Sequence, residues 1–419
     1  LGKTVQAIGV ASECQMERVL VIAPAAARFQ WAREIKKWYV HPKGKHPVTY
    51  VVTKSKDGIH PGAHWVILSY DLARGDPLHH ELLRGRFDMI VLDEGHMLKS
   101  YEAKRTRAVF GANTDPPTHP LADRADKLVA LTGTPLPNRP RECYTLARGL
   151  DWDSIDRMSE EAFRARYNPS MSLGYTVLEK TGRLPELHNR LRCNFMVRRL
   201  KRDVLHQLPA CRYELVYIEE NAEIRRAVQA ENLLGIDPLQ LGRWQGSGDD
   251  EAIATVRRQM GEAKVPRVIE RTKQLMDGGL EKMGLFVWHR SVLDELAEKL
   301  SSFGVAVVDG RCTALQKDRN KQRFIEDPNC RIFLGQILAA GTALDGMQRV
   351  CSWVDIAEPS WVPGDNEQIV DRFWRMEQRN AVQANLLVAP GSFDERILSV
   401  NLFKTEDKSI VLDNRTRER

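Results

Sequence analysis

Residues 87–94 read FDMIVLDE, an apolar run that is almost unbroken and ends in two adjacent carboxylates. A run without strict polar alternation is typical of a strand buried on both faces of a parallel sheet. Ligands of such sheets bind beyond the carboxyl ends of the strands, which is where Asp93 and Glu94 would lie. We therefore expect an acidic binding edge at this point; a solvated acidic turn is the alternative.

Apolar runs of the same kind lie on either side of this strand and recur late in the chain. They are RVLVIAP (18–24), HWVILSY (64–70), DKLVALTGTP (126–135), GLFVWH (284–289), GVAVVDG (304–310), CRIFLGQ (330–336), CSWVDIAEP (351–359) and ANLLVAP (384–390). The stretch FQWAREIKKWYV places Trp31, Ile35 and Trp38 at i, i+4 and i+7, the spacing of an amphipathic helix. Strands that alternate with helices predict a layered α/β fold.

The alternation lapses between residues 151 and 280. ENAEIRRAVQAENLLG and EAIATVRRQMGEAKVPRVIERTKQLM read there as charged amphipathic helices, separated by an expected loop, GRWQGSGDDE. A chain of 419 residues is too long for one ordinary core. We expect an α/β lobe at 1–150, a helical insertion at 151–280 and a second α/β lobe at 281–419.

Composition narrows the class of protein. Hydrophobic residues make up 42% and charged residues 28%, and no apolar run approaches the roughly 18 residues of a membrane span. We expect an intracellular protein with no membrane partner. The net charge of +6 permits a polyanionic partner. The seven cysteines are never spaced as C-x-x-C, which favours free thiols over a zinc site or a disulfide framework.

The first four residues, LGKT, match the end of a phosphate-binding loop. Gly2 and Lys3 would meet the phosphates of ATP, the hydroxyl of Thr4 would bind Mg²⁺, and the helix that follows would point its N-terminus at the anion. Asp93 would hold the same Mg²⁺, and Glu94 would polarise the attacking water. The alternative for LGKT is a chance match of four common residues. We expect the front of the loop to lie upstream, so that a chain truncated here binds ATP poorly.

Another apolar strand ends in a turn made of Thr132, Gly133 and Thr134. These small residues carry two hydroxyl groups, and the turn follows the same type of buried strand as the two carboxylates. We expect it to sense the phosphate and to couple the nucleotide state to the rest of the protein.

The stretch EQIVDRFWRMEQ places Gln368, Arg372, Arg375 and Gln378 on an expected helix. The two arginines are three residues apart and would share a face of that helix. We expect them to act as arginine fingers and the two glutamines to contact the nucleotide. A surface face of salt bridges is the alternative.

With these motifs in order, the chain resembles the Swi/Snf family of superfamily-two helicase-like ATPases. The likeness extends over nearly the whole chain and includes LGKT, VIAPAAARFQWAREIKKW, DEGHMLKS, LTGTPLPNRPRECY, FMVRRLKRDVLHQLP, FVWHRSVLDELAEKL and DRFWRMEQ. GTPLPNRPRECY, VRRLKRDVLHQLP and GEAKVPRVIE look closest to the HARP-like annealing-helicase branch. The resemblance implies two RecA-like lobes with parallel sheets, ATP hydrolysis with Mg²⁺, and translocation on double-stranded or branched DNA.

The resemblance also implies a groove for the DNA backbone. The segments expected to line it contain Arg28, Trp31, Ser69, Tyr70, His289, Arg290, Gly341 and Thr342. His96 would couple nucleotide to DNA, or simply cap its turn. A basic cluster would meet the DNA backbone, or form a solvated face or an ion-pair network between the lobes; it comprises Arg198, Arg199, Lys201 and Arg202.

Three positions depart from the family pattern. The family usually has Gly at the position of Glu377 and Gly near Ala343. Pro137 occupies a position that is often Gln in the family. Two other functions share these motifs: the motor of a restriction or phage-defence system, and a DNA-binding pseudo-ATPase. If the source is prokaryotic or phage, the protein is expected in the cytoplasm with the nucleoid. The sequence does not indicate protein partners.

Overall fold

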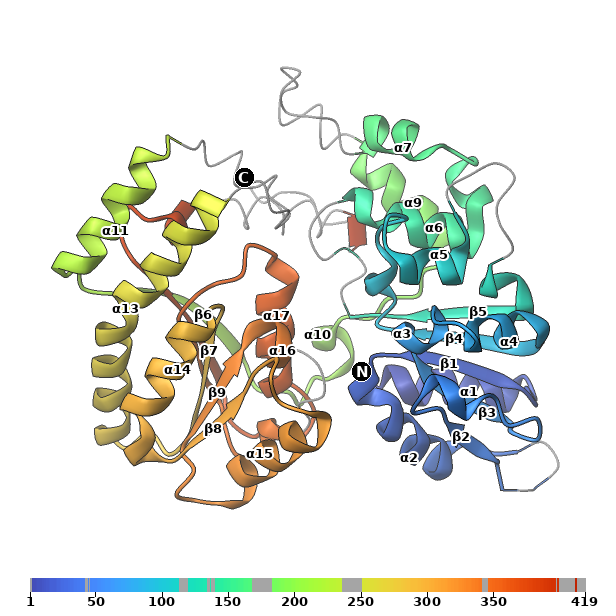
Figure 1. Ribbon diagram of the computed structural model, residues 1–419, viewed down its shortest axis with the longest axis horizontal. Coiled ribbons are helices and arrows are strands. Elements are labelled where there is room, and N and C mark those ends of the chain that lie inside the picture. Colours follow the sequence, from blue (N-terminus) through green and yellow to red (C-terminus); the bar gives the residue numbers. More distant parts are fainter. Residues whose placement is uncertain are drawn as a thin grey trace. The chain divides into compact units, whose positions relative to one another are not determined.

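The computed structural model contains two compact units (Figure 1). It describes residues 2–41, 44, 46–112, 120–133, 136, 140–167, 183–235, 251–340, 346–396, 398 and 411–412, with the side chains of Arg202, Ala314 and Ala340 excepted. The first unit comprises 1–199 with 407–419, and the second comprises 200–406.

The first unit is built on a five-stranded parallel sheet with the order β2-β3-β1-β4-β5. Its described elements are α1 (Lys3–Glu13), β1 (Val19–Ala23), η1 (Ala25–Ala27), α2 (Arg28–Trp38), β2 (Thr49–Val51), η2 (Ser55–Asp57), β3 (Trp65–Ser69), α3 (Tyr70–Ala73), α4 (Leu78–Arg84), β4 (Phe87–Asp93), η3 (Gly95–Leu98), α5 (Lys104–Phe110), η4 (Leu121–Arg124), β5 (Ala125–Leu131), η5 (Pro140–Cys143), α6 (Tyr144–Asp151), η6 (Trp152–Ile155), α7 (Glu160–Tyr167) and α9 (Leu184–Asn194).

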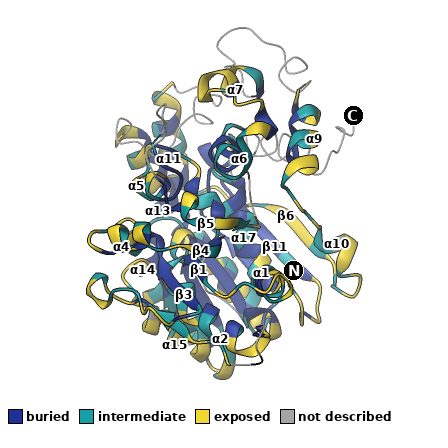
Figure 2. Ribbon diagram, turned by 90° about the vertical axis from the view of Figure 1, so that its right-hand side faces the viewer, coloured by how far each residue is buried: buried dark blue, intermediate teal, exposed yellow. Residues whose placement is uncertain are grey.

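Alternate residues of the strands enter two separate apolar cores, one on each face of this sheet. Val21 and Val91 pack with α1 and α2, whereas Leu20 and Ile90 pack with the helices that follow β3. β1 and β3 are therefore buried throughout and β4 along most of its length, as their dark colour in Figure 2 shows. This burial explains why their sequences are continuous apolar runs.

The second unit has a six-stranded parallel sheet with the order β6-β11-β10-β7-β9-β8. Its described elements are α10 (Lys201–Val204), β6 (Cys211–Tyr217), α11 (Ala222–Leu233), α13 (Glu251–Asp277), β7 (Met283–Val287), α14 (Arg290–Lys299), η8 (Ser301–Phe303), β8 (Val305–Val308), α15 (Ala314–Glu326), β9 (Ile332–Gln336), α16 (Ile337–Ala340), η9 (Met347–Arg349), β10 (Trp353–Ile356), α17 (Pro363–Phe373) and β11 (Val382–Val388).

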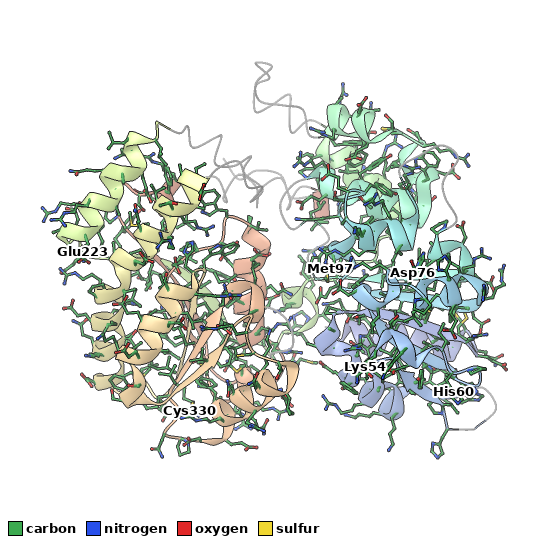
Figure 3. The ribbon with its side chains drawn as sticks, in the orientation of Figure 1. Lys54, His60, Asp76, Met97, Glu223 and Cys330 are labelled. Carbon is green, nitrogen blue, oxygen red and sulfur yellow. The ribbon has the colours of Figure 1, made fainter. Side chains whose placement is uncertain are left out.

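This sheet is also covered on both faces. Leu285 and Val287 of β7 pack with α11, α13 and α14, and Phe286 packs with α15 and α17 on the other face. Figure 3 shows the side chains that fill each unit, with Met97 labelled in the first and the buried Cys330 in the second. The expected α/β fold with two parallel sheets is confirmed.

The described helices of residues 151–280 are divided between the two units. Phe163 of α7 and Leu187 of α9 belong to the core of the first unit, whereas Ile224 of α11 and Met260 of α13 belong to the core of the second. The division falls at 199/200 because the apolar faces of these helices are buried in different units. The expected boundaries at 150 and 280 differ from it for that reason.

Two strands and one helix position differ from the expectation. β2 and the edge strand β6 were not expected, and Trp38 is 46% exposed at the end of α2 instead of packing with Trp31 and Ile35. Its indole donates to Glu34 on the same helix. The expected loop at 242–251 lies almost entirely outside the described residues. Across the described part of the chain, no helix is both long enough and apolar enough to cross a membrane.

Candidate active site

The expected phosphate-binding residues begin the first helix of the chain. Gly2 precedes α1 in a left-handed conformation (φ 68°, ψ 36°), which Gly adopts without a steric penalty. Gly2 has no side chain that could cap this helix, and the first N–H groups of a helix can bind an anion. The amine of Lys3 lies 3.5 Å from the position that a Cβ on Gly133 would occupy. The helix start therefore faces the turn after β5.

Asp93 is the last residue of β4, which pairs with β1 and β5. The indole Nε1 of Trp31 donates to Asp93 Oδ2 at 2.8 Å, and the Glu94 amide donates to Oδ1 at 3.1 Å. The Tyr70 hydroxyl donates to the Asp93 carbonyl oxygen at 2.7 Å. Both the backbone and the carboxylate of Asp93 are thus held by neutral donors.

Burial raises the pKa of Asp93 above its ordinary value, and the neighbouring Glu94 adds to the shift. The hydrogen bond from Trp31 and the positive charge of Lys3 act in the opposite direction. A carboxylate that has lost part of its hydration is stabilised by a cation. A cation at the edge of β4 would therefore stabilise the charged form of Asp93.

Glu94 follows in a left-handed conformation (φ 51°, ψ 51°), which is rare for a residue with a side chain. Strained residues of this kind concentrate at functional sites. Its Oε2 lies 3.3 Å from Nδ1 of His96, and the same His96 nitrogen lies 3.0 Å from the hydroxyl of Thr132. His96 therefore connects the ends of β4 and β5. Thr134, the other expected coupling residue, lies outside the described residues.

The residues expected to line a DNA groove in the first unit are mostly turned inward. Trp31, Ser69 and Tyr70 are 1%, 5% and 3% exposed. Ser69 accepts the Leu72 amide at the start of α3, and burial raises the pKa of Tyr70 well above its ordinary value. Their side chains therefore do not present a surface to a duplex. Arg28 is half-buried, and its Nη1 donates to the Val52 carbonyl at 2.6 Å.

The expected helix with two arginines is shorter than its sequence suggests. α17 ends at Phe373, so Arg372 lies in its last turn and Arg375 lies beyond it. The helix stops because side chains take the carbonyls at its end: Lys201 donates to Trp374 O at 2.6 Å, and Gln378 donates to Phe373 O at 3.0 Å. The two arginines therefore do not share a helix face, which corrects that expectation.

The two glutamines of this segment differ in their surroundings. Gln378 is 7% exposed, and its amide also donates to Cys351 O and accepts the amides of Arg379 and Asn380. Its side chain thus shapes the turn after α17, because backbone groups use both its nitrogen and its oxygen. Gln368 is half-buried within α17.

The basic cluster at 198–202 is divided between the units. Arg198 and Arg199 end the first unit, where Arg199 and Arg192 donate to the Arg198 carbonyl. Lys201 begins α10 in the second unit and forms an ion pair with Asp371 at 2.6 Å. Burial lowers the pKa of Lys201. Arg202 lies in α10, and its side chain is not described.

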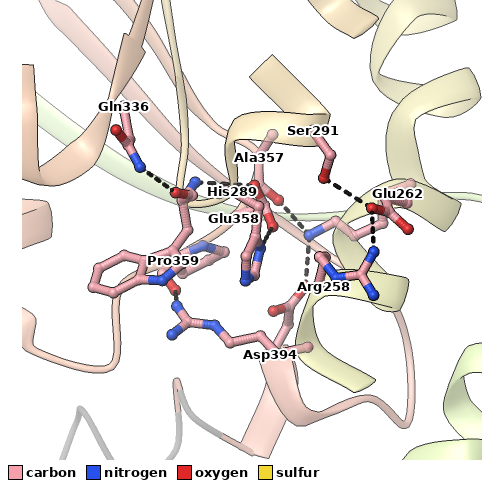
Figure 4. A network of polar contacts seen from close by, with 12 residues as sticks. Arg258, Glu262, His289, Ser291, Gln336, Ala357, Glu358, Pro359 and Asp394 are labelled. Carbon is pink, nitrogen blue, oxygen red and sulfur yellow. Dashed lines mark hydrogen bonds and ion pairs between the residues drawn. The ribbon is translucent and has the colours of Figure 1, made fainter. Parts of the chain in front are cut away.

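At the carboxyl edge of the second sheet, a buried carboxylate is surrounded by its own partners (Figure 4). Glu358, after β10, accepts from the Trp288 and His289 amides at 2.9 and 3.0 Å and lies 2.6 Å from His289 Nδ1. Burial alone would raise the pKa of Glu358, but the hydrogen bonds and charge of His289 outweigh it and lower the pKa. Arg290 is exposed at the start of α14. The remaining expected DNA contacts, Gly341 and Thr342, lie outside the described residues.

Two cations of α13 are buried beside this carboxylate. Lys264 is 1% exposed and donates to the Ala357 and Leu387 carbonyls and to Asp394, the last at 2.5 Å. Arg257 lies 4.4 and 4.7 Å from the ring centroids of Trp288 and Trp361, and burial lowers its pKa to about 10. This buried group was not predicted, although Glu358 follows an apolar run of the sequence just as Asp93 does. That shared position was the available signal.

Comparisons with known proteins identify relatives of this chain. The chain is 28% identical over 400 residues to the SWI/SNF-related matrix-associated actin-dependent regulator of chromatin subfamily A-like protein 1 of Xenopus tropicalis, covering 94% of this chain and 40% of that protein. It is 29% identical over 407 residues to the DNA annealing helicase and endonuclease ZRANB3 of Mus musculus, covering 94% of this chain and 36% of that protein.

The chain thus spans about two fifths of the length of the curated relatives it matches. Among solved structures, the Sulfolobus solfataricus SWI2/SNF2 ATPase core in complex with dsDNA aligns with 98% of this chain and 88% of that chain, at 18% identity and a TM-score of 0.41. A model of the SNF2-related domain matches residues 1–275, which is more than half of the chain, and the chain therefore belongs to the SNF2-related domain family.

Proposed function

We propose that this chain is the ATP-hydrolysing core of a motor that moves on double-stranded DNA. One observation carries the proposal: the start of α1, with Lys3, faces the turn after β5, in the unit where β4 ends at Asp93 and Glu94 follows. Membership of the SNF2-related domain family supports it, as do the relatives named for DNA annealing.

The residues present suit ATP with Mg²⁺. The described residues contain no cluster of three or more His, Cys, Asp or Glu side chains able to hold a metal ion alone. This is compatible with Mg²⁺, which usually takes one or two protein ligands and completes its shell with phosphates and water. Thr4 and Asp93 are the proposed ligands. The bound ion would neutralise charge on the phosphate oxygens.

Each residue of the edge then has a proposed task. Lys3 and the first amides of α1 hold the phosphates, and Glu94 orients the attacking water and accepts its proton. His96 would transmit the state of Glu94 to Thr132, because it lies within reach of both. The roles of Arg372 and Arg375 as transition-state cations stay predictions, to be tested by Arg375→Ala.

The experiment is steady-state ATP hydrolysis with and without duplex DNA, together with ATP-driven displacement of a third strand from a triplex. The protein is expressed with any residues that its reading frame encodes ahead of Leu1. A translocase hydrolyses ATP faster with duplex and displaces the third strand. A DNA-binding pseudo-ATPase shows neither activity, and duplex-stimulated hydrolysis without displacement would contradict translocation.

We further propose that the motor reanneals DNA strands, since relatives are named as annealing helicases. The matching assay follows ATP-dependent closure of a bubble held open by a single-strand-binding protein. Closure at the same rate without ATP would contradict this finer proposal.

A further inference from the structure

Trp31 is buried, and its indole N–H group donates a hydrogen bond at the proposed catalytic edge, which is the carboxyl end of β4. Its side chain is 1% exposed within the apolar core formed by α1, α2 and the sheet. Its Nε1 donates to Asp93 Oδ2 at 2.8 Å, across 62 positions of the sequence. An indole nitrogen can only donate, so this contact has one direction and favours the carboxylate form of its acceptor.

The same core contains a second buried indole that serves as an internal comparison. Trp65 of β3 is 0% exposed, and its Nε1 has no hydrogen-bond partner among the described residues. Its ring packs edge-on against Tyr39, with centroids 5.2 Å apart. A buried Trp in this core is therefore stable without using its N–H group. The bond from Trp31 to Asp93 is then not required by packing alone.

Asp93 is fixed by two side chains from different elements. Trp31, from α2, holds one carboxylate oxygen, and Tyr70, from α3, donates to the Asp93 carbonyl. A side chain held at both its carboxylate and its backbone loses little further freedom when it binds a cation. Neighbouring donors of this kind orient metal-binding carboxylates.

We infer that Trp31 is a positioning residue for Asp93: its indole N–H holds the carboxylate ready for the Mg²⁺ that accompanies the nucleotide. This inference rests on the proposed function, which makes Asp93 a metal ligand. It gives Trp31 a task inside the first unit, in place of the contact with DNA expected from the sequence. Tyr70 supports the same residue from the backbone side.

The test compares Trp31→Phe, Trp65→Phe and Asp93→Asn by calorimetric titration with ADP, with and without Mg²⁺. Each Trp→Phe change removes an indole from the same core, but only Trp31→Phe removes the bond to Asp93. Mg²⁺ should raise the affinity of the wild-type protein for ADP. In Trp31→Phe this increase in affinity should be smaller by a factor of about 10 to 100. Affinity without Mg²⁺ should change little, and Trp65→Phe should keep the full gain.

A second measurement uses the wild-type fold, in case Trp31→Phe does not fold. In protein labelled at the indole nitrogens, the Nε1–H resonance of Trp31 is identified as the one that Asp93→Asn shifts. In the wild-type protein with ADP bound, the same resonance should shift when Mg²⁺ is added. A Mg²⁺ effect that is equal in the two Trp variants, or an unmoved resonance, would overturn the inference and leave the proposed function intact. If Asp93→Asn itself retained the Mg²⁺ effect, the proposed metal site would fail as well.

Discussion

The carboxyl edges of the two sheets each place an acidic residue at or just after the end of a strand, but the two residues differ in their electrostatic surroundings. In the first unit, the carboxylate of Asp93 is held by an indole and an amide, both neutral. In the second, Glu358 is held by His289, beside the buried pair of Lys264 and Asp394. The carboxylate of Asp93 keeps its attraction for a cation, whereas the contacts with His289 already stabilise the charged form of Glu358.

The pKa shifts at the two edges follow this difference. Burial raises the pKa of Asp93, because no adjacent cation outweighs the loss of hydration. At Glu358 the contacts with His289 outweigh burial and lower the pKa. The position of a carboxylate at the end of a strand therefore does not by itself identify a ligand site. The partners of the carboxylate decide whether the edge binds a ligand or stabilises the fold.

The largest expected effect comes from breaking the buried ion pair of the second unit. Lys264→Met leaves Asp394 and two backbone carbonyls without their donor. Removing one partner of a buried pair should lower the free energy of unfolding by about 3–5 kcal/mol. Chemical denaturation measures the change, and Lys273→Met, at an exposed position of the same helix, is the matched control. Equal effects of the two substitutions would show that the pair does not stabilise the unit.

A smaller effect should appear as a dependence of stability on pH. Glu231 of α11 is 1% exposed, and burial raises its pKa to about 8. One oxygen accepts the Phe393 amide at 2.6 Å, while Oε1 has no hydrogen-bond partner among the described residues. The folded state therefore keeps a proton that the unfolded state loses near pH 4.5, and stability falls as pH rises toward 8.

The corresponding measurement compares unfolding free energies at pH 5 and pH 8. Glu231 should make the protein less stable at pH 8 by roughly 3 kcal/mol, and Glu231→Gln should remove that part of the difference. Glu223→Gln, at an exposed position of the same helix (Figure 3), should leave it unchanged. An unaltered pH dependence in Glu231→Gln would contradict the assignment.

The smallest expected effect concerns Glu377, where the family usually has Gly. Its φ of 75° is left-handed, and its ion pair with Arg349 at 2.7 Å is more than half exposed. Such a surface ion pair contributes little to the free energy of unfolding. In Glu377→Gly, the relief of backbone strain should therefore outweigh the loss of the ion pair. Glu377→Gly should stabilise the protein by about 1 kcal/mol. Its neighbour Met376 lies outside the left-handed region, and Met376→Gly should destabilise. Thermal unfolding of both variants gives the sign.

The buried parts of the fold were predictable because burial leaves a simple pattern. β4 and β7 are covered on both faces, and their sequences are continuous apolar runs. β6 was not predicted from the sequence, because it is an edge strand whose side chains, including Tyr213 and Leu215, are largely exposed. α17 looked longer than it is because its end involves Lys201, which comes from a distant part of the chain, and Gln378, which folds back from just beyond the helix.

The candidate site was predictable in part for a similar reason. Asp93 and Glu94 follow directly from the end of an apolar strand, so local sequence locates them. The partners of Asp93 do not, because Trp31 looks like an ordinary core residue of an amphipathic helix. Only the register between α2 and β4 places its nitrogen on the carboxylate. Such tertiary contacts leave no periodic signal in a single sequence.

The most direct test of the central claim is steady-state ATP hydrolysis by the wild-type protein and by Glu94→Gln, each with and without duplex DNA. If the edge of β4 is the catalytic edge, duplex stimulates the wild type, and Glu94→Gln lowers the stimulated kcat about 100-fold or more while nucleotide still binds. Hydrolysis by Glu94→Gln at the wild-type rate would contradict the account.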